Sequence, residues 1–227
     1  MNRVSIAGSP GGIVSAEALW AALVDDTDRP IVIVTDDGEV VFANRQAADH
    51  VGLSDPSELL GRSFHDLCDH EYAEERLACI REVATLGRRM ALDGMTRGRL
   101  RRTLMRSLGE DADGRSLVLL VHVPVPHEGE ASAVPVRRAA VDDLGVLAEL
   151  SEREMEVLKL IAKGYTTAQV AKALHRSVKT IEWHRVSLGS KLGVTNRVEL
   201  ARIAIRAGLV SAEETDERAE TANGSGN

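Results

Sequence analysis

The sequence predicts an α+β protein with two domains, the first built from strands and helices and the second from helices alone. Its 227 residues, 44% of them hydrophobic and 28% charged, suit two soluble globular domains of roughly 100 residues each. Apolar residues occur in strand-like runs between turn residues in the first half, whereas after residue 146 they follow only helical spacing. We expect five segments: residues 1–24, 25–125, 126–145, 146–210 and 211–227.

The net charge of −7 would by itself argue against a nucleic-acid partner, because such a partner attracts basic proteins. The charge is unevenly distributed, however. Residues 150–210 hold 11 basic and 5 acidic side chains, a net of +6, whereas residues 1–149 carry −9 and residues 211–227 carry −4. The overall charge therefore does not exclude a nucleic-acid partner for residues 150–210.

The sequence also disfavours several other classes of protein. No apolar run approaches the ~18 residues that a membrane span needs, and the N-terminal residues lack the apolar stretch of a signal peptide. The two cysteines, Cys68 and Cys79, cannot form a disulfide framework, and no Cys and His residues stand at zinc-site spacing. We expect a cytoplasmic protein that does not bind a membrane.

Strand and helix signals alternate in the first domain. An amphipathic helix is expected over residues 15–25, with Leu19, Trp20 and Leu23 on its apolar side. The turn Asp36-Asp37-Gly38 between two β-branched runs predicts a hairpin, and Asn44 is expected to cap the next helix. A longer helix over 71–85 and strands over 88–92, 99–106 and 117–125 complete a five-stranded antiparallel sheet with helices.

Residues 126–145 are expected to form a linker and a connecting helix. Residues 126–138 combine two prolines, a glycine and charges without periodicity. Val141, Leu144 and Leu147 then stand at helical spacing, which predicts a short amphipathic helix over 139–149. The tail 211–227 contains no apolar residue larger than alanine and is expected to be a disordered acidic tail.

Four helices are expected in residues 146–210. Their start signals are capping residues, at Ser151, Thr166, Ser177 and Asn196. In three of the four, Glu or Gln follows three residues later, which is the capping-box pattern. Only His175 and Arg176 separate the second helix from the cap of the third, a spacing typical of a helix-turn-helix.

The third of these helices, residues 178–192, has two unlike sides. Ile181, Leu188 and Leu192 form an apolar stripe that is expected to face the core. The opposite stripe comprises Lys179, Glu182, Trp183, Val186 and Ser190. Apart from Trp and Val this stripe is polar, as expected for side chains that enter a major groove. Gly189 is expected to weaken the helix by about 1 kcal/mol relative to alanine.

This segment resembles the LuxR-type helix-turn-helix over about 60 residues, almost without a gap. The matching residues are Leu150-Ser-Glu-Arg-Glu154, Val157-Leu158, Ile161-Ala-Lys-Gly164, Val170-Ala171, Leu174, Ser177-Val-Lys-Thr-Ile-Glu182, His184-Arg185 and Lys191-Leu-Gly-Val194. The resemblance implies a four-helix unit of a bacterial transcription regulator. Such a unit binds double-stranded DNA, and a homodimer formed through the fourth helix, residues 196–207, is expected.

Site residues follow from this resemblance position by position. Contacts to bases or adjacent backbone are implied for Lys179, Thr180, Glu182, Trp183 and Val186. Phosphate contacts are expected from Thr166, Thr167, Arg185, Lys191 and Arg197. The dimer contact is expected from Val198, Ala201, Arg202 and Ile205. Two alternatives stay open: Trp183 packs over the turn instead of contacting DNA, and His184 bridges helices as a structural residue.

The first domain resembles a PAS domain over residues 25–125. The likeness is carried by Asp36-Asp-Gly-Glu-Val-Val-Phe-Ala-Asn44, Gly52-Leu53 and Glu58-Leu-Leu-Gly-Arg-Ser63, together with the order of strands and helices. The resemblance implies a sensory domain with a small-molecule, haem or flavin pocket, or a dimerisation module without a ligand.

No cofactor is predicted for this PAS-like domain. A flavin photosensor would need an Asn-Cys-Arg-like motif, which the sequence around Cys68 does not match. Haem on His65, His70 or His122 stays open, as does a small-molecule ligand. A metal held by His65, Cys68 and His70 is also open, although that set lacks a fourth ligand. Cys79 is expected to be a small core residue.

The predicted function is DNA-binding transcription regulation, controlled by the PAS-like domain, with RNA polymerase left open as a further partner. One alternative is a phosphorylated response regulator, because Asp36-Asp37 after an apolar strand resembles a receiver's acidic pair. Residues 1–149 contain no lysine, however, and a receiver needs one. The other alternative is an enzyme domain tethered to DNA, for which no catalytic motif is present.

Overall fold

The structure, a computed structural model, describes residues 3–5, 13–126 and 132–210. It separates into two compact units: unit 1 contains the chain up to Gly94 and Arg101–Val141, and unit 2 contains Met95–Leu100 and the chain from Asp142 onward. The expected disordered tail, 211–227, lies outside the described residues. So do residues 1–2, 6–12 and 127–131 of the expected N-terminal segment and linker.

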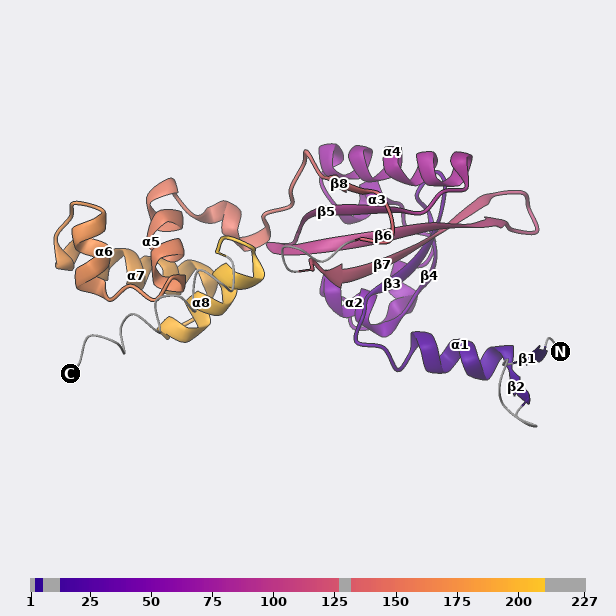
Figure 1. Cartoon of the computed structure of the whole chain (residues 1–227), viewed down its shortest axis with the longest axis horizontal. Helices are drawn as coiled ribbons and strands as arrows, with labels where there is room; N and C mark the ends of the chain where they lie inside the picture. Colours follow the sequence, from indigo (N-terminus) through magenta and orange to yellow (C-terminus); the bar gives the residue numbers. More distant parts are fainter. Residues whose placement is uncertain (1–2, 6–12, 127–131, 211–227) are drawn as a thin grey trace. The chain divides into compact units, whose positions relative to one another are not determined.

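One sheet of six strands forms the centre of unit 1, in the order β4-β3-β7-β6-β5-β8 (Figure 1). The strands are β3 (Ile31–Thr35), β4 (Val40–Ala43), β5 (Met90–Thr96), β6 (Arg99–Glu110), β7 (Ser116–Pro124) and β8 (Val136–Arg138). All five expected strands are present. The expected count of five was wrong because β8 lies in the segment interpreted as a linker, where three exposed residues beside a proline show no strand periodicity. It pairs parallel to β5, so the sheet is mixed and not wholly antiparallel.

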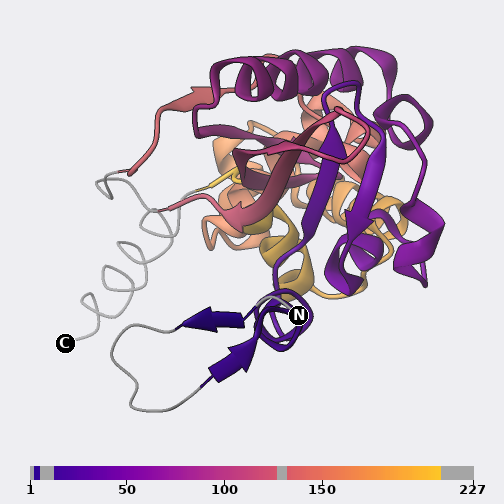
Figure 2. The ribbon, with the colours of Figure 1, turned by 90° about the vertical axis from the view of Figure 1, so that its right-hand side faces the viewer.

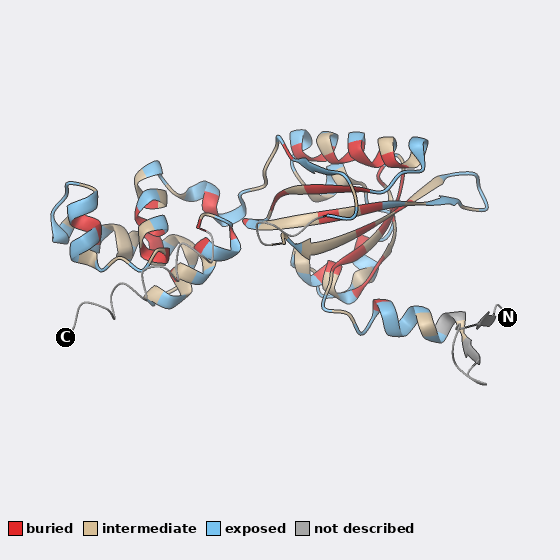
Figure 3. Cartoon of the chain, viewed as in Figure 1, coloured by how far each residue is buried: buried red, intermediate tan, exposed pale blue. Residues whose placement is uncertain are grey.

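Helices cover one face of this sheet. The longest, α4 (His70–Leu86), lies over the strands in both views (Figures 1 and 2). Its sheet-facing side is buried and its outer side exposed (Figure 3), because Leu77, Ile80 and Val83 recur at helical spacing and join the core. Three shorter helical segments precede it: α2 (Arg45–Val51), η1 (Pro56–Leu59) and α3 (Phe64–Leu67). Cys79 is buried in the same core, as expected.

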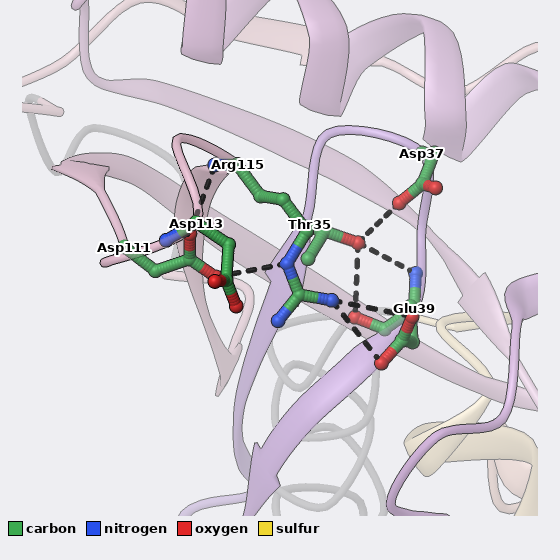
Figure 4. A network of polar contacts seen from close by, with 6 residues as sticks. All are labelled: Thr35, Asp37, Glu39, Asp111, Asp113 and Arg115. Carbon is green, nitrogen blue, oxygen red and sulfur yellow. Dashed lines mark hydrogen bonds and ion pairs between the residues drawn. The ribbon is translucent and has the colours of Figure 1, made fainter.

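The β3–β4 turn packs against α4 and joins the neighbouring β6–β7 turn. Gly38 has φ 92°, and a Cβ there would overlap the Leu77 side chain, so the turn requires glycine. The Thr35 hydroxyl donates to the Asp37 carboxylate, which lowers the pKa of Asp37. Arg115 donates to Asp111 at 2.9 Å and lies 3.4 Å from Glu39 (Figure 4). The two turns are thereby held together.

Asn44 caps α2 as expected and also joins segments distant in sequence. Its side-chain oxygen accepts from the N–H groups of Ala47 and Ile31, at 3.0 and 2.9 Å. Its amide donates to the carbonyls of Val24 and Arg29, at 2.9 and 2.8 Å. Val24 ends the expected N-terminal helix, α1 (Ala16–Val24), which follows the strand pair β1 (Arg3–Ser5) and β2 (Ile13–Ser15).

Unit 2 contains the four expected helices. They are α5 (Glu152–Ala162), α6 (Thr167–Ala173), α7 (Val178–Leu192) and α8 (Arg197–Arg206), preceded by the 3₁₀ helix η2 (Gly145–Glu149). Each helix is capped by the residue expected from the sequence. Among the described residues, no helix combines the length and the apolar composition needed to cross a bilayer.

The expected helix over 139–149 does not form as a whole; only η2 is helical. The Ala139 N–H donates to the Asp93 carbonyl at 2.7 Å, and the Asp143 N–H donates to the Met95 carbonyl at 3.1 Å. These backbone groups therefore extend the pairing that β8 begins and are not available for a helix. Helical spacing of apolar residues was misleading here.

The core of unit 2 includes residues from the β5–β6 hairpin. Met95 is 6% exposed and belongs to the same apolar cluster as Leu147 and Ile161. The backbone supports this placement, because the Gly98 N–H donates to the Asp143 carbonyl at 2.9 Å. Unit 2 is thus made from two separate stretches of chain.

Candidate nucleic-acid interface

The α6–α7 connection has the compact geometry of a helix-turn-helix. Leu174 ends α6, and His175 adopts the left-handed conformation at φ 51°. The Arg176 N–H then donates to the Ala171 carbonyl at 2.9 Å, which closes the turn. Ser177 accepts from the Thr180 N–H and starts α7. The orientation of α7 is therefore determined by hydrogen bonds within the turn.

The buried side of α7 is the one expected from the sequence. Ile181 and Leu188 are fully buried in the unit 2 core, and Leu192 packs against them half-buried. Because these residues anchor the helix, the opposite side must face away from the domain.

That opposite side, which we call the α7 stripe, consists of exposed residues, as expected. The stripe comprises Lys179, Glu182, Trp183, Val186 and Ser190. Trp183 is 65% exposed and Val186 is 73% exposed, and large apolar side chains left uncovered often mark a binding surface. The indole of Trp183 touches the His184 ring edge-on, with 5.2 Å between centroids. At that exposure Trp183 is not packed over the turn.

Beside the stripe lies a groove of about 740 Å³ formed by α7, the loop 193–195 and α8. Arg185 forms part of its wall and is half-buried. Gly189 is also part of the lining, and α7 continues through it without interruption. A Cβ at Gly189 would lie 2.6 Å from the Val194 carbonyl oxygen. Gly189 therefore allows the loop to approach the helix, a role that its low helix propensity did not indicate.

Thr166 and Thr167 stand at the start of α6. Thr166 is exposed, and its hydroxyl accepts from the Gln169 N–H at 3.3 Å. The Gln169 side chain in turn accepts from the Thr166 N–H at 2.8 Å. This reciprocal capping box matches the expected one. The phosphate contact expected here stays a prediction.

Lys191, expected near phosphate, has partners inside unit 2. Its ammonium lies 2.7 Å from the Glu154 carboxylate and donates to the Glu149 carbonyl at 3.0 Å. Glu154 is 3% exposed. Lys191 therefore joins α7 to the start of α5.

Arg197 is likewise occupied within unit 2. Its guanidinium donates to the carbonyls of Tyr165 and Ile161, at 2.5 and 3.3 Å. Ile161 lies in the last turn of α5, where a cation is favourable, and Tyr165 lies in the loop that follows. Sequence reasoning could not identify either pairing, since basic residues beside a DNA-binding helix suggest phosphate contacts equally well.

A second group of charged residues lies near the helix-turn-helix, and the sequence did not predict that these residues come together. A polar pocket of about 380 Å³ is lined by Glu152, Arg153, Glu156, Arg176 and His184. Arg153 donates to the Leu174 carbonyl at 2.7 Å and so supports the turn. Arg176 is exposed within that turn. The only signal for Arg176 was a basic residue directly before a helix cap.

The expected dimer residues lie along one side of α8. Val198 and Ile205 are 61% and 40% exposed, Arg202 is exposed, and Ala201 is half-buried. Leu200 and Ala204 point into the core instead. Within unit 2, Val198 and Ile205 thus leave apolar surface uncovered on this helix.

In unit 1, the expected haem candidates occupy two different environments. His122 alternates with the buried Val118 and Leu120 of β7, contacts the Thr103 hydroxyl at 3.1 Å and stacks on His50. Its burial, together with the neighbouring charges, lowers the pKa of His122 to about 3, so this ring is neutral near pH 7. His65 and His70 are exposed and stack on each other, with 5.2 Å between centroids.

Comparison with known proteins identifies both domains. The family model for bacterial regulatory proteins of the luxR family matches residues 148–204. The model for the PAS fold matches residues 18–123. A curated relative, the oxygen regulatory protein NreC of Staphylococcus aureus strain JH9, is 44% identical over 61 residues. That match spans 27% of this chain and 28% of the length of the relative.

Solved structures were matched as well, at low overall similarity. VqmA of Vibrio cholerae is 16% identical, with 89% of this chain and 94% of VqmA covered and a TM-score of 0.39. The PAS domain of BvgS from Bordetella pertussis is 18% identical, with 48% of this chain and 86% of that domain covered and again a TM-score of 0.39. The assignment depends on the two family models. By those matches, residues 148–204 form a DNA-binding-type domain of the luxR family of bacterial regulatory proteins, and residues 18–123 form a PAS fold.

Proposed function

We propose that this chain is a DNA-binding transcription regulator in which α7 enters the major groove. The observation that carries the proposal is the α7 stripe: one side of a well-anchored helix is exposed and combines charged, hydroxyl and aromatic side chains. The net charge of +6 over residues 150–210 supports it, because sequence-independent DNA affinity comes from neutralising phosphates.

Roles within the interface follow from position. Lys179, Thr180, Glu182, Trp183 and Val186 contact bases or the adjacent backbone, and a Glu carboxylate accepts from cytosine N4. Arg185, Thr166 and Thr167 contact phosphates. Lys191 and Arg197 are omitted from this set, since both are hydrogen-bonded inside unit 2.

The active form is a homodimer. The exposed apolar residues of α8, Val198 and Ile205, supply the contact together with Ala201 and Arg202. Two recognition helices then meet half-sites about one helical turn apart. The PAS domain senses a signal or supports dimerisation, and RNA polymerase is a further partner if the protein activates transcription.

The test uses an operator selected from random oligonucleotides. Affinity for that operator and for random DNA is measured across a range of salt concentrations. Lys179→Ala and Arg185→Ala should weaken binding to both DNAs and each reduce the salt slope by about 1. Lys159→Ala is the matched control, because Lys159 is exposed on α5 outside the proposed interface. Equal binding by all four proteins, wild type included, contradicts the proposal.

The contribution of base recognition is tested with two further variants. Trp183→Ala and Glu182→Ala should reduce the ratio of operator to random-DNA affinity while the affinity for random DNA changes little. Each good base contact contributes about 1–3 kcal/mol of discrimination. An unchanged ratio in both variants would place sequence recognition elsewhere than on α7.

The sensory role has its own measurement. An absorption spectrum and a native mass spectrum of the purified protein detect a bound chromophore or metabolite. A bound molecule whose removal changes operator affinity supports sensing, whereas a ligand-free chain that binds DNA fully leaves dimerisation as the role of the PAS domain.

A further inference from the structure

We infer that unit 1 carries a binding site for a transition-metal dication, best suited to Zn²⁺, formed by His65, His70 and Glu74. One ligand atom from each of these three residues lies within 4.8 Å of the other two. Within the described part of the chain, this is the only such group of three His, Cys, Asp or Glu side chains. The proposed DNA-binding function does not use it.

Local structure brings these side chains together. His65 lies on α3, a four-residue helix that ends at Cys68. His70 is the first residue of α4, and Glu74 follows one turn later on the same side of that helix. The His65 Nε2 lies 3.0 Å from the Glu74 carboxylate. The stacked rings of His65 and His70 are 26° from parallel.

The ligand set suits a borderline-soft metal. Two imidazoles and one carboxylate favour Zn²⁺, Cu²⁺ or Ni²⁺ over Mg²⁺ and Ca²⁺, which prefer oxygen alone. Tetrahedral Zn²⁺ with bonds near 2.0 Å requires ligand atoms about 3.3 Å apart. The His65 Nε2 and the Glu74 carboxylate, 3.0 Å apart, are already near that separation. All three side chains are exposed, so a rotation of His70 completes the site and water takes the fourth position.

Cys68 is not part of this site, although its sequence position between the two histidines suggested it. Its thiol donates to the Phe64 carbonyl at 2.9 Å, back toward its own helix. The third ligand comes instead from Glu74, nine residues after His65. The packing of α3 against α4 therefore decides the ligand set.

Metal binding has a consequence for stability. A metal ion held by one ligand from α3 and two from α4 links the two helices directly. Because the unfolded chain does not hold these ligands together, binding stabilises the folded state by mass action.

The experiment titrates the full-length protein, free of any affinity tag, with Zn²⁺ by calorimetry at pH 7.5 and follows thermal unfolding. The expected result is one Zn²⁺ per chain and a rise in Tm. His65→Ala, His70→Ala and Glu74→Gln should each weaken Zn²⁺ binding by about tenfold or more, since each removes one of three ligands. Glu71→Gln, an exposed acid on the same helix, is the matched control and should bind like the wild type.

A second measurement distinguishes the ligand set His65, His70 and Glu74 from a set that includes Cys68. Co²⁺ loaded in place of Zn²⁺ should give visible d–d bands without a thiolate-to-cobalt charge-transfer band, and Cys68→Ser should leave both spectrum and affinity unchanged. Thermal unfolding without metal verifies that each variant folds. Three results would contradict the proposal. They are a thiolate-to-cobalt band, equal Zn²⁺ binding by the wild type and the His65→Ala/His70→Ala variant, and no saturable Zn²⁺ binding by the wild type. None of these experiments measures operator affinity, so a negative result for metal binding does not contradict the DNA-binding proposal.

Discussion

Glu154 accepts hydrogen bonds from four groups in three residues. Its carboxylate receives the Ser151 N–H and hydroxyl, the Ser187 hydroxyl and the Lys191 ammonium, at 2.6 to 2.9 Å. Burial raises the pKa of Glu154, but these hydrogen bonds together lower it by more, so that the pKa falls to about 2. One side chain therefore completes a local helix cap and joins α5 to α7.

Glu154 should make the stability of unit 2 depend on pH. Its folded pKa of about 2 lies below the usual 4.5, so its contribution is present above pH 4.5 and is lost as pH falls toward 2. A shift of this size corresponds to about 3 kcal/mol as an upper value. Glu154→Gln should remove that contribution at pH 7, leaving a smaller further loss on acidification.

The measurement is urea unfolding between pH 2 and 7, in a chain where Trp20→Phe leaves Trp183 as the one tryptophan. Glu152→Gln, an exposed acid on the same helix, is the control and should retain the wild-type pH dependence. If wild type and Glu154→Gln lose equal stability on acidification, the role assigned to this carboxylate is wrong.

At the scale of elements, the loop that follows α7 packs so closely against the helix that it restricts which residue can stand at position 189. Gly189 lies in its last turns, and its carbonyl accepts from the Val194 N–H at 2.9 Å. The returning loop comes so close that a Cβ would lie 2.6 Å from the Val194 oxygen. Tertiary contact, not helix propensity, determines which residue fits.

Gly189→Ala should therefore destabilise unit 2. Propensity alone predicts a gain of about 1 kcal/mol from this change, whereas displacing the loop 193–195 should cost more than that gain. Ser190→Ala, the exposed neighbouring position, should be neutral or slightly stabilising. Free energies of unfolding from denaturant curves decide the matter, and a more stable Gly189→Ala protein contradicts the packing argument.

At the scale of the whole molecule, the charge of −7 is the sum of unlike parts. Acidic residues outside the +6 segment should repel DNA and lower its non-specific binding. Removing residues 211–227, which carry a net of −4, should strengthen binding to random DNA several-fold at low salt and hardly at all at high salt.

A matched variant keeps the length of the tail and neutralises its charge. Replacing the five acidic residues of 211–227 by their amides should strengthen random-DNA binding about as much as truncation does. Fluorescence anisotropy with a random duplex measures both. Unchanged binding in either protein would remove the electrostatic role of the tail.

The composition of unit 2 from two stretches of chain gives a further prediction. Met95 lies in its core, so Met95→Ala should lower the stability reported by Trp183 by about 2–5 kcal/mol through lost burial and a cavity. Met90→Ala is the matched control, because Met90 lies in the core of unit 1. If Met90→Ala shifts the Trp183 transition and Met95→Ala does not, the assignment of Met95 to unit 2 is wrong.

Much of the fold could be predicted because its signals are local. Strand alternation, the Asp-Gly turn, helix caps and the two sides of α7 each depend on residues a few positions apart. Predictions that failed or needed change involved weak or misleading local patterns: the three-residue strand β8 and the expected helix over 139–149. In both segments, backbone hydrogen bonds to β5 determined the structure.

By itself the sequence determined the fold class, the helices of the LuxR-type domain and the side of α7 that faces away from its core. Only the tertiary structure decided the partners of individual side chains. Lys191 reaches Glu154 across 37 residues and Arg197 reaches Tyr165 across 32, so neither remains in the proposed DNA interface. Periodicity and capping act within one or two turns, whereas an ion pair forms with whichever group the folded chain brings within reach.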